Sequence, residues 1–418
     1  MSLASVMRAE AALLLPTYDR YKVLLRKGRG VYVYDDAGHA YLDLLSGIGV
    51  NALGHGHPAV RKVLVQQADK LIHISNLFYH DYQAELAKRL TRISGLDRTF
   101  FCNSGTEAWE AALKFARAYA RTNSKNGSRP AWRVLALENS FHGRTFGSLS
   151  TTATRKYREP FEPLVPGVKF VRANVVRDLE RKFDPSVCAI GIETIQGESG
   201  INPISTEFLH AARALANRYG ALLILDEIQC GLGRTGQWFA YQHHGVKPDM
   251  LTIAKPLAAG LPLGAMLTTE AVARCVKPGM HGTTFGGGPL ACAVAIAVID
   301  AIERQGLLEH VRKVGDYFLA QLKSLQDRHP SILDVRGCGL MLAAELDSAD
   351  LAKAVHVGML KRRIILNRTH DTVLRFLPPF ILQRKHVDHA INVLDAALSS
   401  AAKSVKTPVP TSSGRSGK

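Results

Sequence analysis

Four short apolar runs in the middle of the chain most constrain what its 418 residues can fold into. The runs occupy residues 134–137, 189–192, 221–225 and 250–253. They alternate with stretches of helical periodicity such as 106–121, and a further stretch of this kind precedes them at 85–93. Runs that are apolar at every position are typical of strands buried on both faces, and their separation by helices is typical of a mostly parallel sheet. The sequence therefore predicts an α/β layer.

The two ends of the chain have a different pattern. Residues 1–15 predict a helix, and two short segments joined by an Ala-Gly turn predict a β-hairpin over 30–35 and 40–44. The stretch from 289 to about 328 is helix-rich. Residues 332–395 mix amphipathic helices with short strands at 341–346 and 373–376. This mixture predicts a second, smaller α+β domain.

The formal net charge of +17 favours some partners over others. Part of the charge lies after Ser399, where a Ser/Gly/Pro-rich composition predicts disorder. The rest is spread thinly along the chain, which indicates a general attraction for anions such as phosphorylated cofactors and dicarboxylates. A nucleic-acid groove usually has a denser basic stripe, so no nucleic-acid partner is expected.

Targeting segments, disulfides and metals are not expected either. No apolar run approaches the ~20 residues of a membrane helix, and residues 11–15 are too short for the core of a signal peptide. The six cysteines lie far apart without a CxxC pair, so we expect reduced and mostly buried thiols. No histidine or cysteine spacing matches a metal site. These observations predict a soluble cytoplasmic protein without a metal and without membrane contact.

A turn that opens the helix at 106–121 has the composition of a phosphate site. Ser104, Gly105 and Thr106 place hydroxyl groups and a glycine at a helix N-terminus, where free N–H groups and the helix dipole favour an anion. A plain N-cap would explain the same residues. Three further segments carry aromatic, basic, acidic or hydroxyl side chains close to glycines, at 140–145, 193–200 and 281–288.

Polar residues also follow two of the strands, at the sheet edge where α/β proteins bind ligands. Asp226 would cap a helix, bind magnesium or keep the nitrogen of a pyridine ring protonated, with Gln229 near the oxygen of that ring. Lys255 would be a snorkelling surface residue or, if buried, an amine with a lowered pKa that forms a Schiff base. An aspartate at one strand end, a lysine at the next and a phosphate-like turn together favour the second role for Lys255.

In the order and spacing of these motifs the chain resembles the class III, or ω-amino acid, pyridoxal-phosphate aminotransferases of fold type I, and within them the acetylornithine enzymes. The resemblance extends from residue 15 to about 398. It implies a large domain with a mostly parallel sheet and a smaller α+β domain built from both chain ends. The expected division is 1–62 and 306–400 for the small domain, 63–305 for the large domain, and a disordered basic tail at 401–418.

The resemblance implies pyridoxal 5'-phosphate as the cofactor and a role for each matching residue. Lys255 would carry the cofactor and act as general base, and Asp226 would pair with the ring nitrogen. The other implied cofactor contacts are Ser104, Gly105 and Thr106 for the phosphate, Phe141 for the ring face and Gln229 for the ring oxygen. Thr284 would reach the phosphate of a neighbouring subunit, which implies a homodimer with shared active sites.

The same resemblance implies two carboxylate anchors for two substrates. Arg144 would hold the α-carboxylate of the amine donor, and Arg375 would hold that of glutamate. Glu198 would mask Arg375 while the donor is bound, with Thr283 and Tyr18 near the substrate. The implied reaction transfers the ω-amino group of N2-acetylornithine to 2-oxoglutarate, giving N-acetylglutamate semialdehyde and glutamate, a step of arginine biosynthesis.

Several alternatives stay open at this point. Departures from the commonest family residues, none at a position with an assigned role, are Thr194, Pro256 and Gly288. Ile48 stands where ornithine aminotransferases resemble one another in having tyrosine, which weakens free ornithine as the donor. The related donors are succinylornithine, ornithine, 4-aminobutyrate and an intermediate of lysine synthesis. A nucleic-acid-binding protein with an inactive fold is the alternative from another class, and the intact set of Lys255, Asp226 and Arg144 argues against it.

Overall fold

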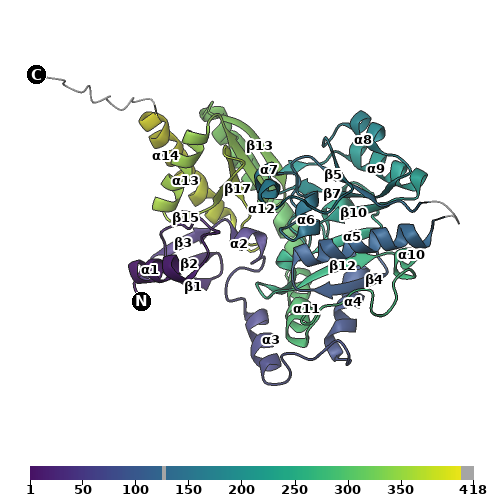
Figure 1. Cartoon of the computed structure of the whole chain (residues 1–418). Helices are drawn as coiled ribbons and strands as arrows, with labels where there is room; N and C mark the ends of the chain where they lie inside the picture. Colours follow the sequence, from purple (N-terminus) through teal and green to yellow (C-terminus); the bar gives the residue numbers. More distant parts are fainter. Residues whose placement is uncertain (125–128, 406–418) are drawn as a thin grey trace, which may run out of the picture.

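A computed structural model of the chain describes residues 1–124 and 129–405. Within these residues the centre is a seven-stranded sheet with the order β4-β12-β11-β10-β7-β5-β6 (Figure 1). Its strands are β4 (Arg98–Cys102), β5 (Arg133–Leu137), β6 (Val168–Val171), β7 (Val187–Glu193), β10 (Leu222–Asp226), β11 (Met250–Ile253) and β12 (Gly264–Thr268). Neighbouring strands are parallel except at β12, which runs antiparallel to β4 and β11. The predicted mostly parallel sheet is confirmed.

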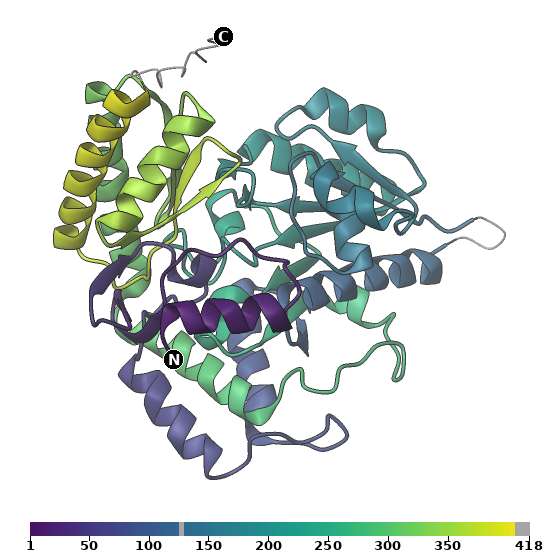
Figure 2. The ribbon, with the colours of Figure 1, turned by 60° about the vertical axis from the view of Figure 1, so that its left-hand side comes forward.

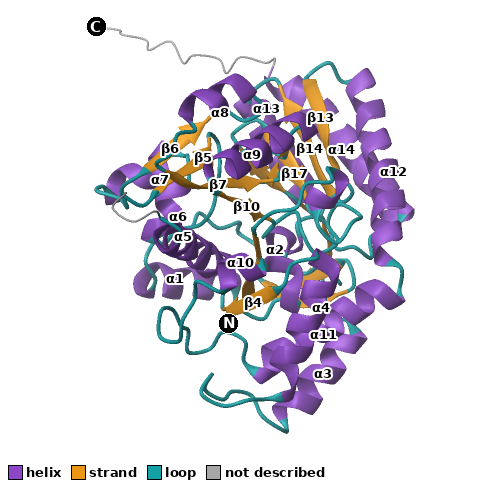
Figure 3. Ribbon diagram, turned by 90° about the vertical axis from the view of Figure 1, so that its right-hand side faces the viewer, coloured by secondary structure: helices purple, strands orange, loops and turns teal. Residues whose placement is uncertain are grey.

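Helices cover both faces of this sheet, as Figure 3 shows. Successive strand residues point to opposite faces. In β10, Leu222 packs in the core cluster beneath α5 (Gly105–Thr122), whereas Leu223 packs in the cluster that includes α9 (Thr206–Tyr219). Each leucine buried in this way stabilises the fold by about 1.5–3 kcal/mol, which is why the strands are apolar along their length. The remaining helices of the layer are α4 (Asp81–Ser94), α6 (Phe146–Thr151) and α8 (Val176–Lys182).

A second part of the molecule combines the two ends of the chain, which lie together in Figures 1 and 2. One sheet has the order β1-β2-β3-β15, so the C-terminal strand β15 (Ile364–Ile365) extends an N-terminal meander. The meander consists of β1 (Leu25–Arg29), β2 (Tyr32–Asp35) and β3 (Ala40–Asp43). A second sheet contains β13 (Ile332–Cys338), β14 (Met341–Leu346), β17 (Val373–Phe376) and β16 (Asn367–Thr369).

Long helices complete the fold. α11 (Pro289–Arg304) packs on α3 (Pro58–Ala68) and α4, and α12 (Leu307–Arg328) packs on β13. α13 (Ala349–Lys361) and α14 (Arg384–Val405) pack on each other. The short elements are α1 (Leu3–Leu13), α2 (Ser46–Gly49), α7 (Arg155–Arg158), α10 (Glu270–Ala273), η1 (Glu159–Phe161), η2 (Ala240–His243), η3 (Lys255–Ala258), β8 (Ile195–Gln196) and β9 (Asn202–Pro203).

The end of α14 differs from the sequence prediction. The helix continues to Val405 and therefore extends into the range 401–418, for which a disordered tail is predicted. Ala401 is buried against the core, which explains why the helix does not end at residue 400. Residues 406–418 of the predicted tail lie outside the described residues. In the described part of the chain all six cysteines are free thiols, and no helix is long and apolar enough to cross a membrane.

Candidate active site

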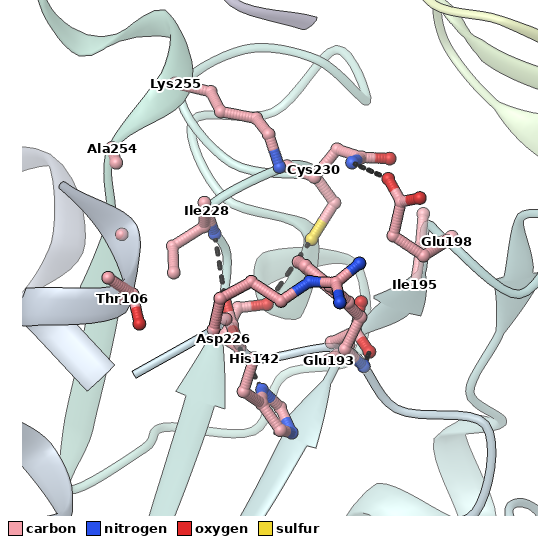
Figure 4. Close-up of a pocket in the computed structure, with 15 residues that line it drawn as sticks. Thr106, His142, Glu193, Ile195, Glu198, Asp226, Ile228, Cys230, Ala254 and Lys255 are labelled. Atoms are coloured by element: carbon pink, nitrogen blue, oxygen red, sulfur yellow. Dashed lines mark hydrogen bonds and ion pairs between the residues drawn. The ribbon is translucent and has the colours of Figure 1, made fainter. Parts of the chain in front are cut away.

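A cavity of about 260 Å³ lies where β7, β10 and β11 end at their carboxyl edge (Figure 4). Open α/β sheets bind their ligands at this edge. The side chains of Lys255, Asp226 and Glu198 enter the cavity from different elements. The lining residues that the sequence also singles out for cofactor or substrate are Gly105, Thr106, Phe141, Arg144, Glu198, Asp226, Gln229 and Lys255.

Lys255 begins η3 directly after β11 and is partly buried in the cavity wall. Burial, more than any charge nearby, lowers the pKa of its amine below the usual value of 10.5. Among the described residues, no carboxylate lies within 4.0 Å of this amine, so no ion pair holds it in the charged form. A lowered pKa favours the neutral amine, which is the form that attacks an aldehyde or accepts a proton.

Asp226 ends β10 and is fixed by two hydrogen bonds. One carboxylate oxygen lies 2.7 Å from Nδ1 of His142, and the other accepts the N–H of Ile228 at 3.1 Å. The His142 ring is itself stacked on Trp109 of α5, with ring centroids 3.8 Å apart and an interplanar angle of 2°. A buried carboxylate with a fixed orientation suits a cationic ring nitrogen at the bottom of a cavity.

The sequence singles out the segment 140–145, but its pattern assigns no role to His142. The signal for His142 is its place directly after Phe141, which lines the cavity, in a turn where a buried polar ring needs a hydrogen-bond partner. Its partner, Asp226, is 84 residues further along the chain.

The N-terminus of α5 forms one end of the cavity, where Gly105 and Thr106 belong to the lining. Ser104 is the N-cap, and its hydroxyl accepts the N–H of Glu107 at 3.3 Å. A Cβ on Gly105 would lie 2.8 Å from the Ile228 side chain, so only glycine fits there. The Thr106 hydroxyl bonds Ser148 at 2.8 Å. Free N–H groups, hydroxyls and the positive end of a long helix are what a phosphate requires.

Arg144 and Phe141 form one rim of the cavity. The Arg144 guanidinium is exposed and lies 3.6 Å from the ring centroid of Tyr157 and 5.6 Å from that of Phe141. In the described part of the chain no carboxylate lies within 4.0 Å of Arg144. This guanidinium is therefore held by aromatic faces and keeps its N–H donors for another anion.

Arg375 of β17 approaches the cavity from the other side and is fully buried. Its Nη1 donates to Oε1 of Glu198 at 2.7 Å, to the carbonyl of Gly197 at 3.0 Å and to Oε1 of Gln229 at 3.3 Å. Burial raises the pKa of Glu198, but the charges of Arg375 and Lys255 and the hydrogen bonds from Arg375 and Gln229 together outweigh burial, so the pKa is lowered overall. Nη2 of Arg375 is buried and has no hydrogen-bond partner in the part of the chain that the structure describes, so this guanidinium can bind a second anion.

Five residues singled out by the sequence do not line this cavity: Ser104, Arg375, Tyr18, Thr283 and Thr284. Ser104 precedes the lining residue Gly105, and Arg375 bonds the lining residues Glu198 and Gln229. Tyr18 is 78% exposed and lies beside α1 in a separate hollow. Thr284 is exposed on the loop 281–288, and Thr283 bonds the side chain of Asn103 at 3.0 Å. The cavity of one chain is thus built without Thr284 and Tyr18.

Glu193 is a cavity residue to which sequence reasoning assigned no role. It ends β7, is 6% exposed and accepts the N–H groups of Phe141 and Gly197. Burial, followed by the charge of Asp226, raises its pKa to about 8. The strand end at Glu193 was the available signal, because the same reasoning identified Asp226.

The side chains present fit pyridoxal phosphate. Lys255 offers an amine for its aldehyde, Asp226 a fixed carboxylate for its ring nitrogen, and the N-terminus of α5 a cradle for its phosphate. Phe141 supplies an aromatic face at the same cavity. Gln229 also lies in the lining, but its amide is turned toward Glu198 and Arg375.

Comparison with known proteins agrees with this site. The family described as Aminotransferase class-III matches residues 15–398. The acetylornithine aminotransferase of Methanocaldococcus jannaschii is 46% identical over 391 residues, which cover 93% of this chain and 96% of that protein. The acetylornithine aminotransferase of Aquifex aeolicus is 45% identical over 382 residues, 91% of this chain and 98% of that protein.

Solved structures give the same result for the fold. The ornithine aminotransferase of Toxoplasma gondii superposes with a TM-score of 0.92 at 32% identity and covers 97% of this chain and 96% of its own. The acetylornithine aminotransferase of Elizabethkingia anophelis has a TM-score of 0.85 at 29% identity, with 96% and 100% covered. Because enzymes for different donors share this fold, the fold does not select the donor. The chain belongs to the class III aminotransferases, whose cofactor is pyridoxal phosphate.

Proposed function

We propose that this enzyme transfers the ω-amino group of N2-acetylornithine to 2-oxoglutarate, giving N-acetylglutamate semialdehyde and glutamate. The observation that carries the proposal is the pair of arginines near Lys255. Arg375 is held by Glu198, whereas Arg144 has no carboxylate partner within residues 1–124 and 129–405. An ω-aminotransferase needs this asymmetry, since its two substrates present their carboxylates at different distances from the reacting nitrogen. Relatives at 44–46% identity that are named acetylornithine aminotransferase support the choice of donor.

In the first half-reaction the donor carboxylate binds Arg144 and its ω-amine lies near Lys255. Glu198 stays on Arg375, which keeps this second guanidinium away from the donor. Bound pyridoxal phosphate supplies the aldehyde that accepts the amino group and a ring that withdraws electrons from the reacting carbon. The neutral amine of Lys255 moves a proton from the substrate carbon, a role worth about 10²–10⁴-fold in rate. The Asp226 carboxylate, oriented by His142, would pair with the ring nitrogen.

In the second half-reaction 2-oxoglutarate replaces the product. Its α-carboxylate takes the place of Glu198 on Arg375, and Glu198 turns aside within the cavity. Arg375 can form a bidentate contact because its second terminal nitrogen has no hydrogen-bond partner among the described residues. Lys255 then returns the proton to the carbon that becomes the α-carbon of glutamate.

A visible spectrum of the purified protein tests the cofactor and both substrates. We expect a yellow absorbance that bleaches when N-acetylornithine is added and returns when 2-oxoglutarate follows. Succinylornithine, ornithine, 4-aminobutyrate and lysine-pathway amines serve as competing donors under the same conditions. A higher kcat/KM for an unacylated donor would contradict the proposed substrate, and salt-sensitive DNA binding without any cofactor absorbance would contradict the enzyme.

We propose a homodimer with shared active sites. Thr284, which the family resemblance assigns to the phosphate of a second subunit, is exposed and does not line the cavity of its own chain. Large apolar side chains are exposed close to its loop, where His73 contacts Phe285 at 5.2 Å between ring centroids. These side chains are Ile72, Leu77, Phe78, Tyr79 and Phe285. A patch of this kind marks a protein–protein interface.

Light scattering on a size-exclusion column tests the dimer. We expect twice the chain mass of 45.6 kDa. Phe78→Glu places a charge in the apolar patch, and we expect it to yield monomers that lose activity. An active enzyme with the mass of one chain would contradict the proposal.

We also propose the division into a large domain of residues 63–305 and a small domain of 1–62 and 306–400. The pairing of β15 with β3 supports a small domain built from both ends. The boundary near 305 coincides with the turn between α11 and α12, where Gly306 has a φ of 62°. Limited proteolysis that cuts first at this turn would support it.

The proposed location is the cytoplasm. All six cysteines are free thiols, the form that a reducing compartment maintains. Fractionation of the source cells followed by detection of the chain tests this location.

A further inference from the structure

Glu193 connects two loops near the cavity, one that contains Phe141 and one that contains Gly197. It pairs with Asp226 in the register of β7 and β10, so both carboxylates leave the sheet edge on the same face. One oxygen of Glu193 accepts the N–H of Phe141 at 2.8 Å, and the other accepts the N–H of Gly197 at 3.2 Å. Figure 4 shows Glu193 near the end of its strand beside Asp226. A single buried carboxylate therefore satisfies one backbone donor from each loop.

Each of these loops leads to one of the two arginines. Phe141 precedes Arg144 by three residues in the same turn. In the other loop, Gly197 donates its backbone N–H to Glu193, and its backbone carbonyl accepts a hydrogen bond from Nη1 of Arg375 at 3.0 Å. The next residue, Glu198, is the carboxylate that holds Arg375. A continuous hydrogen-bonded path therefore runs from the Phe141 loop through Glu193 to Arg375.

The backbone at Gly197, in the second of the two loops, is tightly packed and cannot shift freely. A Cβ on Gly197 would overlap the side-chain amide of Gln229, so this peptide is packed directly against a cavity residue. A shift of the Gly197 peptide would move both its carbonyl and Glu198, the two groups that share Nη1 of Arg375. Displacements of about 1 Å near a reacting centre cost up to about 10²-fold in rate.

We propose that Glu193 is a positioning residue that sets the donor side and the 2-oxo acid side of the cavity relative to each other. It does so by holding the Phe141 loop and the Gly197 turn from one carboxylate. The inference rests on the proposed function, because that function assigns Arg144 to the donor and Arg375 to the 2-oxo acid. Glu193 touches neither substrate in this role and acts only through the two backbone N–H groups.

Replacing Glu193 tests the proposal by separating the two half-reactions of the full-length holoenzyme. In ping-pong kinetics, kcat/KM for each substrate reports its own half-reaction. Glu193→Ala removes both acceptors and leaves two buried N–H groups without a partner, a loss that corresponds to about tenfold or more in each kcat/KM. Bleaching by the donor alone and recovery with 2-oxoglutarate alone measure the same two steps directly.

Glu193→Gln gives a sharper signature and keeps the test available if the alanine variant does not fold. The Gln carbonyl accepts only one N–H group, and the shorter bond to Phe141 is the one we expect it to keep. Its NH₂ group then faces the N–H of Gly197, so two hydrogen-bond donors meet without an acceptor between them. Above pH 8, where Glu193 of wild type is ionised and both of its oxygens accept, we therefore expect kcat/KM for 2-oxoglutarate to fall several times more than kcat/KM for the donor.

Glu227→Gln is the matched control. Glu227 is a fully buried carboxyl beside Asp226 that also accepts two backbone N–H groups, those of Ala240 and Tyr241, each at 2.7 Å. It does not line the cavity. We expect both kcat/KM values of this variant to stay within about twofold of wild type. Peptide-level hydrogen exchange should show faster exchange at 140–148 and 194–200 in Glu193→Ala, and unchanged exchange there in Glu227→Gln.

Three results would overturn the inference. The first is an unchanged pair of kcat/KM values in both Glu193 variants, and the second is an equal loss in the Glu193 and Glu227 variants. The third is a loss in Glu193→Ala confined to one half-reaction, which would make Glu193 a residue of one loop only. A failure of the proposed function is visible separately, because wild type would then not bleach with N-acetylornithine. In that case the same comparison is made with whichever amine wild type accepts.

Discussion

The two arginines of the cavity have opposite surroundings. Arg144 is exposed and rests on the faces of Tyr157 and Phe141, without a carboxylate within 4.0 Å in the described chain. Arg375 is fully buried and shares one nitrogen among Glu198, Gly197 and Gln229. The first guanidinium is solvated and free, and the second is desolvated and already paired.

This difference explains how one cavity serves two substrates in turn. A solvated cation needs no counter-ion while it waits, so Arg144 accepts a carboxylate at little cost. A buried cation without a partner costs several kcal/mol, so Glu198 leaves Arg375 only when another carboxylate replaces it. The buried arginine is therefore a switch that responds to the arriving substrate, whereas the exposed arginine is a constant anchor.

The largest expected effect comes from the residue that both sides share. Lys255→Ala should slow both half-reactions alike, by about three orders of magnitude, because the general base is lost. Single-turnover absorbance with each substrate alone measures the two rates. If the variant keeps one half-reaction near the wild-type rate, Lys255 serves only one of the two substrates. That result would contradict a general base shared by the donor and the 2-oxo acid.

Arg375→Ala should affect the two sides unequally. We expect kcat/KM for 2-oxoglutarate to fall by about 10²-fold, since a charge-assisted bidentate contact is lost. The donor half-reaction should fall less, although Glu198 is left without its cation. Arg375→Lys is the control, because lysine keeps the positive charge but cannot bind a carboxylate through two N–H groups at once. Equal losses for both substrates would mean that Arg375 does not discriminate between them.

Arg144→Ala should produce the reverse pattern with a smaller size. We expect kcat/KM for N-acetylornithine to fall by about tenfold, because an exposed guanidinium contributes less than a buried one. The value for 2-oxoglutarate should change little. Amine donors that have no carboxylate at the end of the molecule opposite the ω-amine provide the control, since their rates should not depend on Arg144. A loss that is confined to 2-oxoglutarate would exchange the roles of the two arginines.

The sequence predicts the frame of this site better than the contacts within it. Strand β11 and strands β14 and β17 have the predicted bounds, because apolar runs report strands directly. Strand β12 was not predicted, since the glycine-rich stretch 254–264 that leads into it resembles a loop. Lys255 and Asp226 were found because a strand end places a side chain at a known edge.

The contacts that were not predicted join residues far apart in the chain. His142 meets Asp226 across 84 residues, and Phe141 meets Glu193 across 52. Whether a loop folds back over a particular strand depends on packing such as the stack of His142 on Trp109. Periodicity and motif spacing report local structure and do not contain this information.

The smallest expected effect is on how the stability of the fold depends on pH. This dependence should involve Arg375 and not Arg144. The lowered pKa of Glu198 means that its ion pair with Arg375 stabilises the fold above the unfolded value near 4.5. That contribution is lost as pH falls through the lowered pKa of the folded state. Glu198→Gln should therefore be less stable than wild type at pH 7 by about 1–2 kcal/mol, because Arg375 loses its counter-charge.

Thermal unfolding of the two proteins between pH 7 and pH 3 measures this difference. We expect the gap in Tm to be constant near neutral pH and to narrow once wild-type Glu198 begins to take up a proton. Arg144→Ala is the comparison variant, and its gap to wild type should not vary with pH in the same way, since Arg144 has no carboxylate partner in the described chain. A Glu198→Gln gap that widens as pH falls has the wrong sign for an ion pair, and it would show that burial, rather than Arg375, controls this carboxyl.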